Sequence, residues 1–173
     1  MDSADRQKEF ILTVEKYRDM VWRICFRMLA DREEARDAVQ ETFVRAWQTL
    51  HRYDSRYSMA TWLGTIACRL CIDVLRKRRL RLKIETETAG SNVNTSPDPG
   101  AYTERNEIEN LLQRTVRALS PMQKAVFILH EIEQLPAWEI QRISGLSAVQ
   151  IKSNLYIARQ KVRKALIKEG IQY

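Results

Sequence analysis

The stretch Pro136-Ala-Trp-Glu-Ile-Gln-Arg-Ile-Ser-Gly-Leu-Ser-Ala-Val-Gln150 decides the fold of the second half of this chain. Proline is tolerated at a helix start, so the stretch predicts a first helix that begins at this proline and ends at Ser144. Gly145 and the following leucine form a turn. Ser147, with Gln150 three residues later, predicts a capping box that begins a second helix. Two helices joined by a tight turn are the layout of a helix-turn-helix DNA reader.

The second helix of this unit is expected to be amphipathic as far as Lys168. Its apolar stripe consists of Ile151, Leu155, Ala158, Val162, Ala165 and Leu166, which recur at helical spacing. The opposite face carries Gln150, Ser153, Asn154, Ile157, Gln160 and Lys161. A helix with this pattern can place its first two turns in a major groove.

Length and cysteine content limit the class of protein. The 173 residues allow one domain or two small ones. No apolar run is long enough to span a membrane, and the polar first residues predict no signal peptide. The three cysteines, Cys25, Cys68 and Cys71, lack the spacing of a disulfide framework, which is typical of a protein in a reducing cytoplasm.

Charge is distributed in blocks along the chain. Residues 1–83 contain 18 basic and 12 acidic side chains, residues 84–110 contain one basic and six acidic, and residues 111–173 contain 10 basic and four acidic. Two basic blocks on either side of an acidic strip suit a polyanion such as nucleic acid. From charge alone, two ordinary solvated basic domains are an equally good explanation.

Residues 85–100 contain almost no large apolar side chain and end in Pro-Asp-Pro-Gly. Such a segment cannot bury enough surface to offset the entropy of ordering it. It therefore predicts a flexible linker. No strand-like alternation of useful length occurs in the chain. The sequence thus predicts an all-α fold of two small helical domains, residues 1–83 and 104–173, joined by a flexible acidic linker at 84–103.

The first block predicts three helices. The first covers residues 10–29, and Asp31 with Glu34 caps the second. The inward stripe of the second helix is Ala35, Val39, Phe43, Ala46, Trp47 and Leu50, and its polar face includes Asp37, Gln40, Glu41, Arg45 and Gln48. A loop with His51, Tyr53 and Tyr57 follows. The third helix starts near Thr61 and ends in a basic run, with Thr65, Cys68, Arg69, Ile72, Arg76 and Arg79 expected to point outward.

Taken together, these motifs resemble a known family. Residues 37–47, 61–63, 66–67 and 72–79 are similar to the first domain of bacterial sigma factors of the extracytoplasmic-function (ECF) group of the sigma-70 family. Residues 119–129 and 140–159 resemble the second domain of that group. The resemblance implies a sigma-2-like domain and a sigma-4-like helix-turn-helix domain. It also implies an alternative sigma factor that binds core RNA polymerase and directs promoter-specific transcription initiation, usually under an anti-sigma factor that is often anchored in the membrane.

The resemblance also assigns candidate binding residues. Polymerase binding falls on Asp37, Gln40, Glu41 and Arg45. Contact with the melted minus-ten element falls on Tyr53, Tyr57, Thr65, Arg69, Arg76 and Arg79. Contact with the minus-thirty-five duplex falls on Gln150, Lys152, Ser153, Asn154, Arg159 and Lys161, of which the amides and the serine suit base edges and the cations suit phosphates. Val149, Asn154 and Ile157 depart from the usual pattern, so the promoter sequence of relatives does not carry over.

Two other classes of protein share some of these features. A one-component regulator, with a helical sensor domain fused to the helix-turn-helix, would explain the second block but not the polar docking face or the basic helix of the first. An enzyme that uses Cys68 and Cys71 lacks a phosphate loop, a nucleophile motif or metal-ligand spacing, so the thiols are interpreted as structural. The sequence predicts no catalytic residue, cofactor, metal or small-molecule substrate, and a cytoplasmic location. His130, Trp47 and Trp62 are expected to be structural, and Asp73 to pair with a neighbouring arginine.

Overall fold

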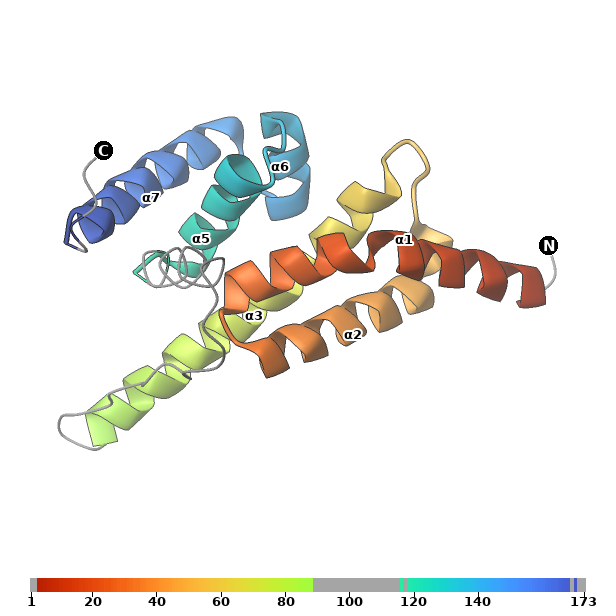
Figure 1. Cartoon of the computed structure of the whole chain (residues 1–173), viewed down its shortest axis with the longest axis horizontal. Coiled ribbons are helices and arrows are strands. Elements are labelled where there is room, and N and C mark those ends of the chain that lie inside the picture. Colours follow the sequence, from red (N-terminus) through yellow and green to blue (C-terminus); the bar gives the residue numbers. More distant parts are fainter. Residues whose placement is uncertain (1–2, 89–115, 117, 169, 171–173) are drawn as a thin grey trace.

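The computed structural model describes residues 3–88, 116, 118–168 and 170, and every regular element in these ranges is helical (Figure 1). The first part of the chain forms α1 (Ser3–Leu29), α2 (Arg32–Thr49), the 3-10 turn η1 (Leu50–Arg52) and α3 (Met59–Thr88). The second part forms α5 (Pro121–Phe127), the π-turn η2 (Ile128–Ile132), α6 (Ala137–Ser144) and α7 (Ala148–Lys168). The prediction of an all-α fold is confirmed. None of the described helices combines the length and apolar character needed to cross a membrane.

Local chemistry sets the turn between α1 and α2. Ala30 has a φ of 55°, a left-handed conformation that ends α1. Asp31 is extended, and its Oδ1 accepts a hydrogen bond from the Glu34 backbone N–H at 2.8 Å. The predicted N-cap is therefore present. The carboxylate of Glu34 pairs with Arg78 of α3, which ties α2 to α3.

Two cations lie at the C-terminal end of α1, where backbone carbonyls carry partial negative charge. The Arg78 guanidinium donates to the Leu29 carbonyl at 3.3 Å. The Lys124 ammonium of α5 donates to the Met28 carbonyl at 3.2 Å. Lys124 is only 5% exposed. A residue of the second part of the chain thus completes the end of a helix in the first part.

The longest element is α3, with 30 residues. It packs against α1 and α2, and its last turns project beyond them in Figure 1. The helix continues to Thr88, so the first residues of the predicted linker are helical. The rest of that linker, and the predicted start of the second domain at residue 104, lie within residues 89–115, outside the described residues.

The predicted helix-turn-helix is present as α6 and α7. Gly145 ends α6 with a φ of 73°, a conformation that glycine adopts at little cost. In the predicted capping box, the Ser147 N–H donates to Gln150 Oε1 at 2.9 Å and the Gln150 N–H donates to Ser147 Oγ at 3.3 Å. A second capping box, formed by Ser120 and Gln123, begins α5.

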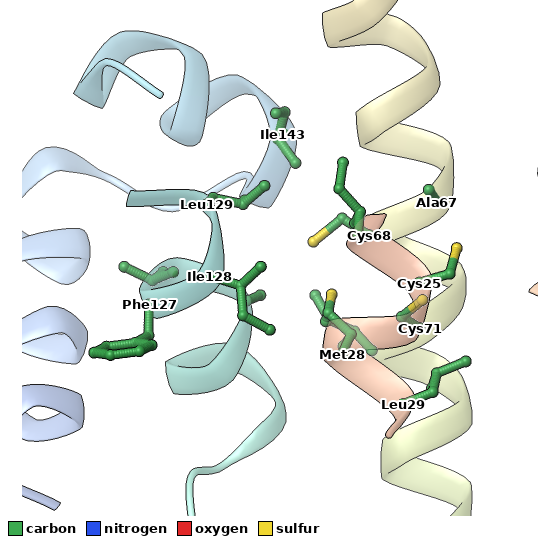
Figure 2. Close-up of a cluster of buried hydrophobic side chains, with 14 of the residues drawn as sticks. Cys25, Met28, Leu29, Ala67, Cys68, Cys71, Phe127, Ile128, Leu129 and Ile143 are labelled. Atoms are coloured by element: carbon green, nitrogen blue, oxygen red, sulfur yellow. The ribbon is translucent and has the colours of Figure 1, made fainter. Parts of the chain in front are cut away.

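A single hydrophobic core continues across both parts of the chain. Figure 2 shows two groups of buried side chains that face each other across the boundary between the parts. The first group is Met28 and Cys68, and the second is Ile128, Leu129 and Ile143. All of these residues are less than a tenth exposed. The two parts therefore pack as one body in this structure.

Candidate nucleic-acid and partner interfaces

The polar face of α2 points away from the core. Asp37, Gln40 and Arg45 are exposed, and Glu41 is half-buried. Arg45 Nε donates to Glu41 Oε1 at 2.6 Å, one helical turn apart. The face thus presents an ion pair beside an acid and an amide, which together can form oriented, charge-assisted hydrogen bonds to a complementary helix.

An exposed apolar edge that sequence reasoning missed lies beside this polar face. Trp47 was expected to point inward but is 43% exposed, and Val44 is 42% exposed. The Trp47 ring packs against Phe10 of α1 with ring centroids 5.1 Å apart. Trp47 lies at the edge of the apolar stripe, so only part of its large ring reaches the core. Amphipathic rings of this kind are common at protein interfaces.

The loop between η1 and α3 holds the predicted aromatic residues. Tyr53 packs on Trp62, with centroids 5.1 Å apart, and its hydroxyl donates to the Tyr57 carbonyl at 2.6 Å. Burial raises the pKa of Tyr53, so this phenol stays neutral. In the same loop, the side-chain hydrogen bond from Arg56 lowers the pKa of Asp54. The loop is therefore fixed by its own contacts.

The structure divides the residues that were expected to point outward from α3. Arg69, Arg76 and Arg79 are exposed, as predicted. Cys68 is fully buried and Ile72 is 5% exposed, so the prediction for these two residues was wrong. The physical reason is that α5 and α6 pack on α3, so the helix is covered on more than one side.

Two further α3 side chains bond within the helix. Thr65 is half-buried and donates to the Thr61 carbonyl at 2.7 Å. Asp73 lies 3.9 Å from Arg76, which agrees with the expected pairing. Near its basic end α3 forms an open hollow with the start of α5, lined by Arg76, Arg79, Leu80, Lys83, Ser120, Pro121 and Met122.

On α7 the predicted DNA-contacting residues fall into two groups. Arg159 bonds to Glu131 at 2.6 Å and Lys161 bonds to Gln123 at 3.1 Å, so both cations are held within the second part of the chain. Gln150 is used in the capping box, and Asn154 Nδ2 donates to the Gln150 carbonyl at 2.8 Å.

Lys152 and Ser153 are exposed and contact no partner in the described part of the chain. Val149 and Tyr156 share their face and are 77% and 65% exposed. The helix therefore presents a mixed polar and apolar surface to solvent.

The cysteines are unsuited to nucleophilic chemistry. Burial raises the pKa of Cys68 to about 12, and a hydrogen bond with Cys25, together with burial, raises the pKa of Cys71. Thiols of this kind stay protonated and unreactive. The described residues contain no cluster of side chains that could hold a metal ion. The cysteines act as apolar core residues.

The geometry defines a class of protein: a helix-turn-helix DNA reader packed against a basic three-helix domain. Comparisons with known proteins agree. The model of "Sigma-70 region 2" matches residues 13–81, and that of "Sigma-70, region 4" matches residues 109–162. The ECF RNA polymerase sigma factor SigW of Bacillus subtilis is 29% identical over 168 residues, covering 92% of this chain and 90% of SigW.

Two solved structures share the fold. The sigma factor RpoE of Bartonella quintana, in complex with the anti-sigma factor NepR, matches with a TM-score of 0.70 and 19% identity, covering 92% of this chain and 97% of RpoE. CnrH, in complex with the cytosolic domain of CnrY, matches with a TM-score of 0.68 and 21% identity, covering 94% of this chain and 90% of CnrH. The chain belongs to the ECF group of the sigma-70 family, whose members are non-enzymatic transcription initiation factors.

Proposed function

We propose that this alternative sigma factor binds core RNA polymerase through α2, contacts the minus-ten element through α3 and its preceding loop, and reads the minus-thirty-five element through α7. The observation that carries the proposal is the order of the three surfaces along one chain of two sigma regions. A one-component regulator would not need the region 2 domain, so that alternative is not favoured.

The polymerase contact is assigned to Asp37, Gln40, Glu41 and Arg45 because these side chains form a polar face opposite the apolar stripe of α2. Glu41 and Arg45 pair with each other, so exchanging them keeps an ion pair on the helix while reversing the charges that a partner meets. The half-exposed rings and methyls of Trp47 and Val44 add an apolar edge to the same surface.

The promoter contacts are assigned by chemistry. Arg69, Arg76 and Arg79 carry exposed positive charge along α3, which suits the backbone of a single strand. Tyr53 and Tyr57, in the loop before that helix, and Thr65, in its second turn, are assigned to an unstacked base. On α7, Gln150, Ser153 and Asn154 suit base edges, and Lys152, Arg159 and Lys161 suit phosphates.

Two further parts of the proposal concern context. The fold is shared with the sigma factor RpoE, solved together with the anti-sigma factor NepR, and with CnrH, solved together with the cytosolic domain of CnrY; the first of these supports control of this chain by an anti-sigma factor. A protein that acts on core RNA polymerase works where the polymerase is, so we place it in the cytoplasm. The domain limits 1–83 and 104–173 remain our proposal.

Transcription in vitro tests the function. Purified core polymerase is mixed with the full chain and fragmented host DNA, and the 5′ ends of the transcripts are mapped. We expect starts at a limited set of sites that share two sequence elements and that are absent without the chain. Binding of the chain to DNA without core polymerase, together with no new start sites, would instead indicate the one-component regulator.

The Glu41→Arg/Arg45→Glu double variant tests the docking surface. It should lose at least about tenfold in affinity for core polymerase, because complementary charges set the orientation of such contacts. Its helicity should match the wild type. A matched control is Arg18→Asp/Asp19→Arg, which exchanges another exposed pair, on α1 instead of α2. Unchanged core affinity in the first variant would contradict the assignment.

A further inference from the structure

The second part of the chain packs on α1 and on the first half of α3 around an apolar centre. Gly64 of α3 lies opposite Ile143 of α6, and a Cβ atom at Gly64 would be 3.6 Å from Ile143 Cδ1. Figure 2 shows the sulfur of Cys68 on the side of α3 that faces Leu129 and Ile128. A glycine and a cysteine at this contact allow the helices to approach closely.

An acidic side chain of the second part lies between two cations of the first. The Glu133 carboxylate pairs with Arg27 and lies 3.6 Å from Arg23. Only 11% of the Glu133 side chain is exposed, and Arg27 is 24% exposed. Leaving one charge of a largely buried pair without its partner is costly. A substitution at Glu133 that leaves Arg27 largely buried without its partner should therefore destabilise the packed arrangement.

Other polar contacts surround the same centre. The Thr61 hydroxyl at the start of α3 donates to the Glu139 carboxylate of α6. The Arg142 guanidinium lies over the ring of Tyr57, a cation–π arrangement. Lys124 donates to the Met28 carbonyl, as described above. The contacts join α1, α3 and the loop before α3 to α5 and α6.

The π-turn η2 directs two glutamates to different partners. The Glu133 N–H donates to the Ile128 carbonyl at 2.9 Å, which closes the wide turn. Glu131, at the outside of the turn, pairs with Arg159 inside the second part of the chain. Glu133 pairs across the boundary with α1. One short segment thus supplies both an internal and a bridging contact, and π-turns often occur at functional positions.

We infer that this arrangement is a closed, self-inhibited form of the chain, held by Glu133 between Arg23 and Arg27, and that it must open before the first turns of α3 can engage the minus-ten strand. In the closed form Thr61 is 2% exposed, Cys68 is fully buried and Arg142 covers Tyr57. The inhibitory step rests on the proposed role of α3 in minus-ten binding. The closed packing of the two parts does not depend on that role.

Opening exposes the apolar centre to water, which opposes it. A partner that binds only the open form shifts the equilibrium by its preference for that form. Core polymerase and promoter DNA must therefore together bind the open form more tightly than the closed form. The exposed surface of α7 is accessible in the closed form, so only the proposed minus-ten contact requires the two parts to separate.

Thiol labelling of the full chain measures the closure directly. Cys68 lies at the boundary, while Cys25 and Cys71 contact each other between α1 and α3 and serve as internal references. The chain is treated with N-ethylmaleimide under native conditions, and each modified peptide is followed by mass spectrometry. Because local opening controls the labelling of a buried thiol, Glu133→Lys should raise the Cys68 rate roughly tenfold or more, with Cys25 and Cys71 unchanged.

Three variants make the result specific. Glu131→Lys breaks the pairs with Arg159 and His130, which both lie inside the second part of the chain, and should leave the Cys68 rate within about twofold of wild type, because exposed pairs contribute little. Adding Arg23→Glu and Arg27→Glu to Glu133→Lys should restore protection. Gly64→Leu places a bulky side chain against Ile143 of α6, and less closely against Ile24 of α1, and should open the boundary without changing any charge. Its gain in helix propensity favours a folded α3.

Transcription by core polymerase provides the second measurement. Glu133→Lys and Gly64→Leu should start transcription several-fold faster than wild type at limiting polymerase, and the triple variant Arg23→Glu/Arg27→Glu/Glu133→Lys, which restores the pairing, should not. Wild-type Cys68 that is labelled as fast as in the Glu133→Lys chain, or protection that rises with protein concentration as in a swapped dimer, overturns the closure. Faster labelling with an unchanged transcription rate overturns the inhibition. If no variant directs initiation at all, the proposed function fails while the labelling still decides whether the chain is closed.

Discussion

The two helices expected to contact promoter DNA, α3 and α7, are exposed to very different degrees. On α7 one stripe is buried, with Ile151 and Leu155 in the core, and the opposite face is open to solvent. On α3 the first half is covered on more than one side, by α1 and α2 and by α5 and α6. The comparison shows that the exposure of a helix depends on which other helices pack against it, and not only on the pattern of polar and apolar residues in its own sequence.

This difference in exposure has a consequence for how each helix can bind DNA. A helix that is open on one face can meet duplex DNA without rearrangement of the protein. A helix that is covered on more than one side can meet DNA only through the residues that stay exposed, which on α3 include Arg69, Arg76 and Arg79. We therefore expect the two DNA contacts to respond differently to mutation, and the following predictions test this from the largest expected effect to the smallest.

The buried first half of α3 should dominate stability. Leu63 is fully buried, so Leu63→Ala should lower the free energy of unfolding by about 2–5 kcal/mol through lost burial and a cavity. Leu80, on the same helix, is 60% exposed, and Leu80→Ala should change it by less than about 0.5 kcal/mol. Urea denaturation of the full chain measures both. Equal effects would mean that α3 is not differentially covered.

The exposed face of α7 should determine base preference. Asn154→Ala should change which minus-thirty-five sequences are preferred, by about 1–3 kcal/mol for a bidentate contact. Lys152→Ala, at the neighbouring exposed cation, should weaken binding to all sequences and reduce the salt slope by about 0.9. Selection of holoenzyme on randomised duplexes, repeated at several salt concentrations, separates the two outcomes. A uniform loss from Asn154→Ala would place base reading elsewhere, for example at Val149 and Tyr156.

The start of α7 depends on its cap. Ser147→Ala removes the oxygen that accepts from the Gln150 N–H and should cost about 1 kcal/mol. Ser153→Ala, six residues later on the same helix, removes a hydroxyl with no partner in the described residues and should cost less than about 0.5 kcal/mol. Thermal unfolding compares the pair. Identical melting temperatures would show that the cap contributes nothing.

The smallest effect should come from Glu131, which joins η2 to α7. Burial alone would raise the pKa of Glu131, but the hydrogen bond and charge of Arg159 outweigh it and lower the pKa. A lowered pKa means that the pair stabilises the fold above the unfolded pKa and that this contribution is lost as pH falls through the folded pKa. Glu131→Gln should therefore cost at most about 1 kcal/mol at pH 7 and nothing in strong acid. A difference that grows on acidification would reverse this sign.

Local features of the fold could be predicted from sequence because each depends on residues a few positions apart. The Asp31 cap, the Ser147 box and the left-handed Gly145 are of this kind. The burial of Cys68 and Ile72 could not be predicted in the same way, because the covering residues come from α5 and α6. Likewise the partners Arg27 and Glu133 lie 106 residues apart.

One signal for the buried face of α3 was nevertheless present in the sequence. Gly64, Cys68 and Ile72 follow one another at helical spacing on a side that was expected to be polar. A helix with small or apolar residues on two sides is usually buried on both. Among the candidate site residues, Arg69, Arg76 and Arg79 were correctly expected to be exposed. A charged guanidinium is costly to bury without a partner, so arginines usually stay in contact with water.

The length of α3 can be compared with the length of a nucleic-acid strand. From Thr61 to Arg79 an α-helix rises about 27 Å, at about 1.5 Å per residue. Along one strand of B-form DNA the same distance corresponds to about eight nucleotides. Under the proposed minus-ten contact, the covered start and the projecting basic end of this helix meet opposite ends of one such stretch of nucleic acid (Figure 1). Electrostatic capture can begin at the arginine end while the threonine end is still shielded, so the helix can order the encounter in time as well as in space.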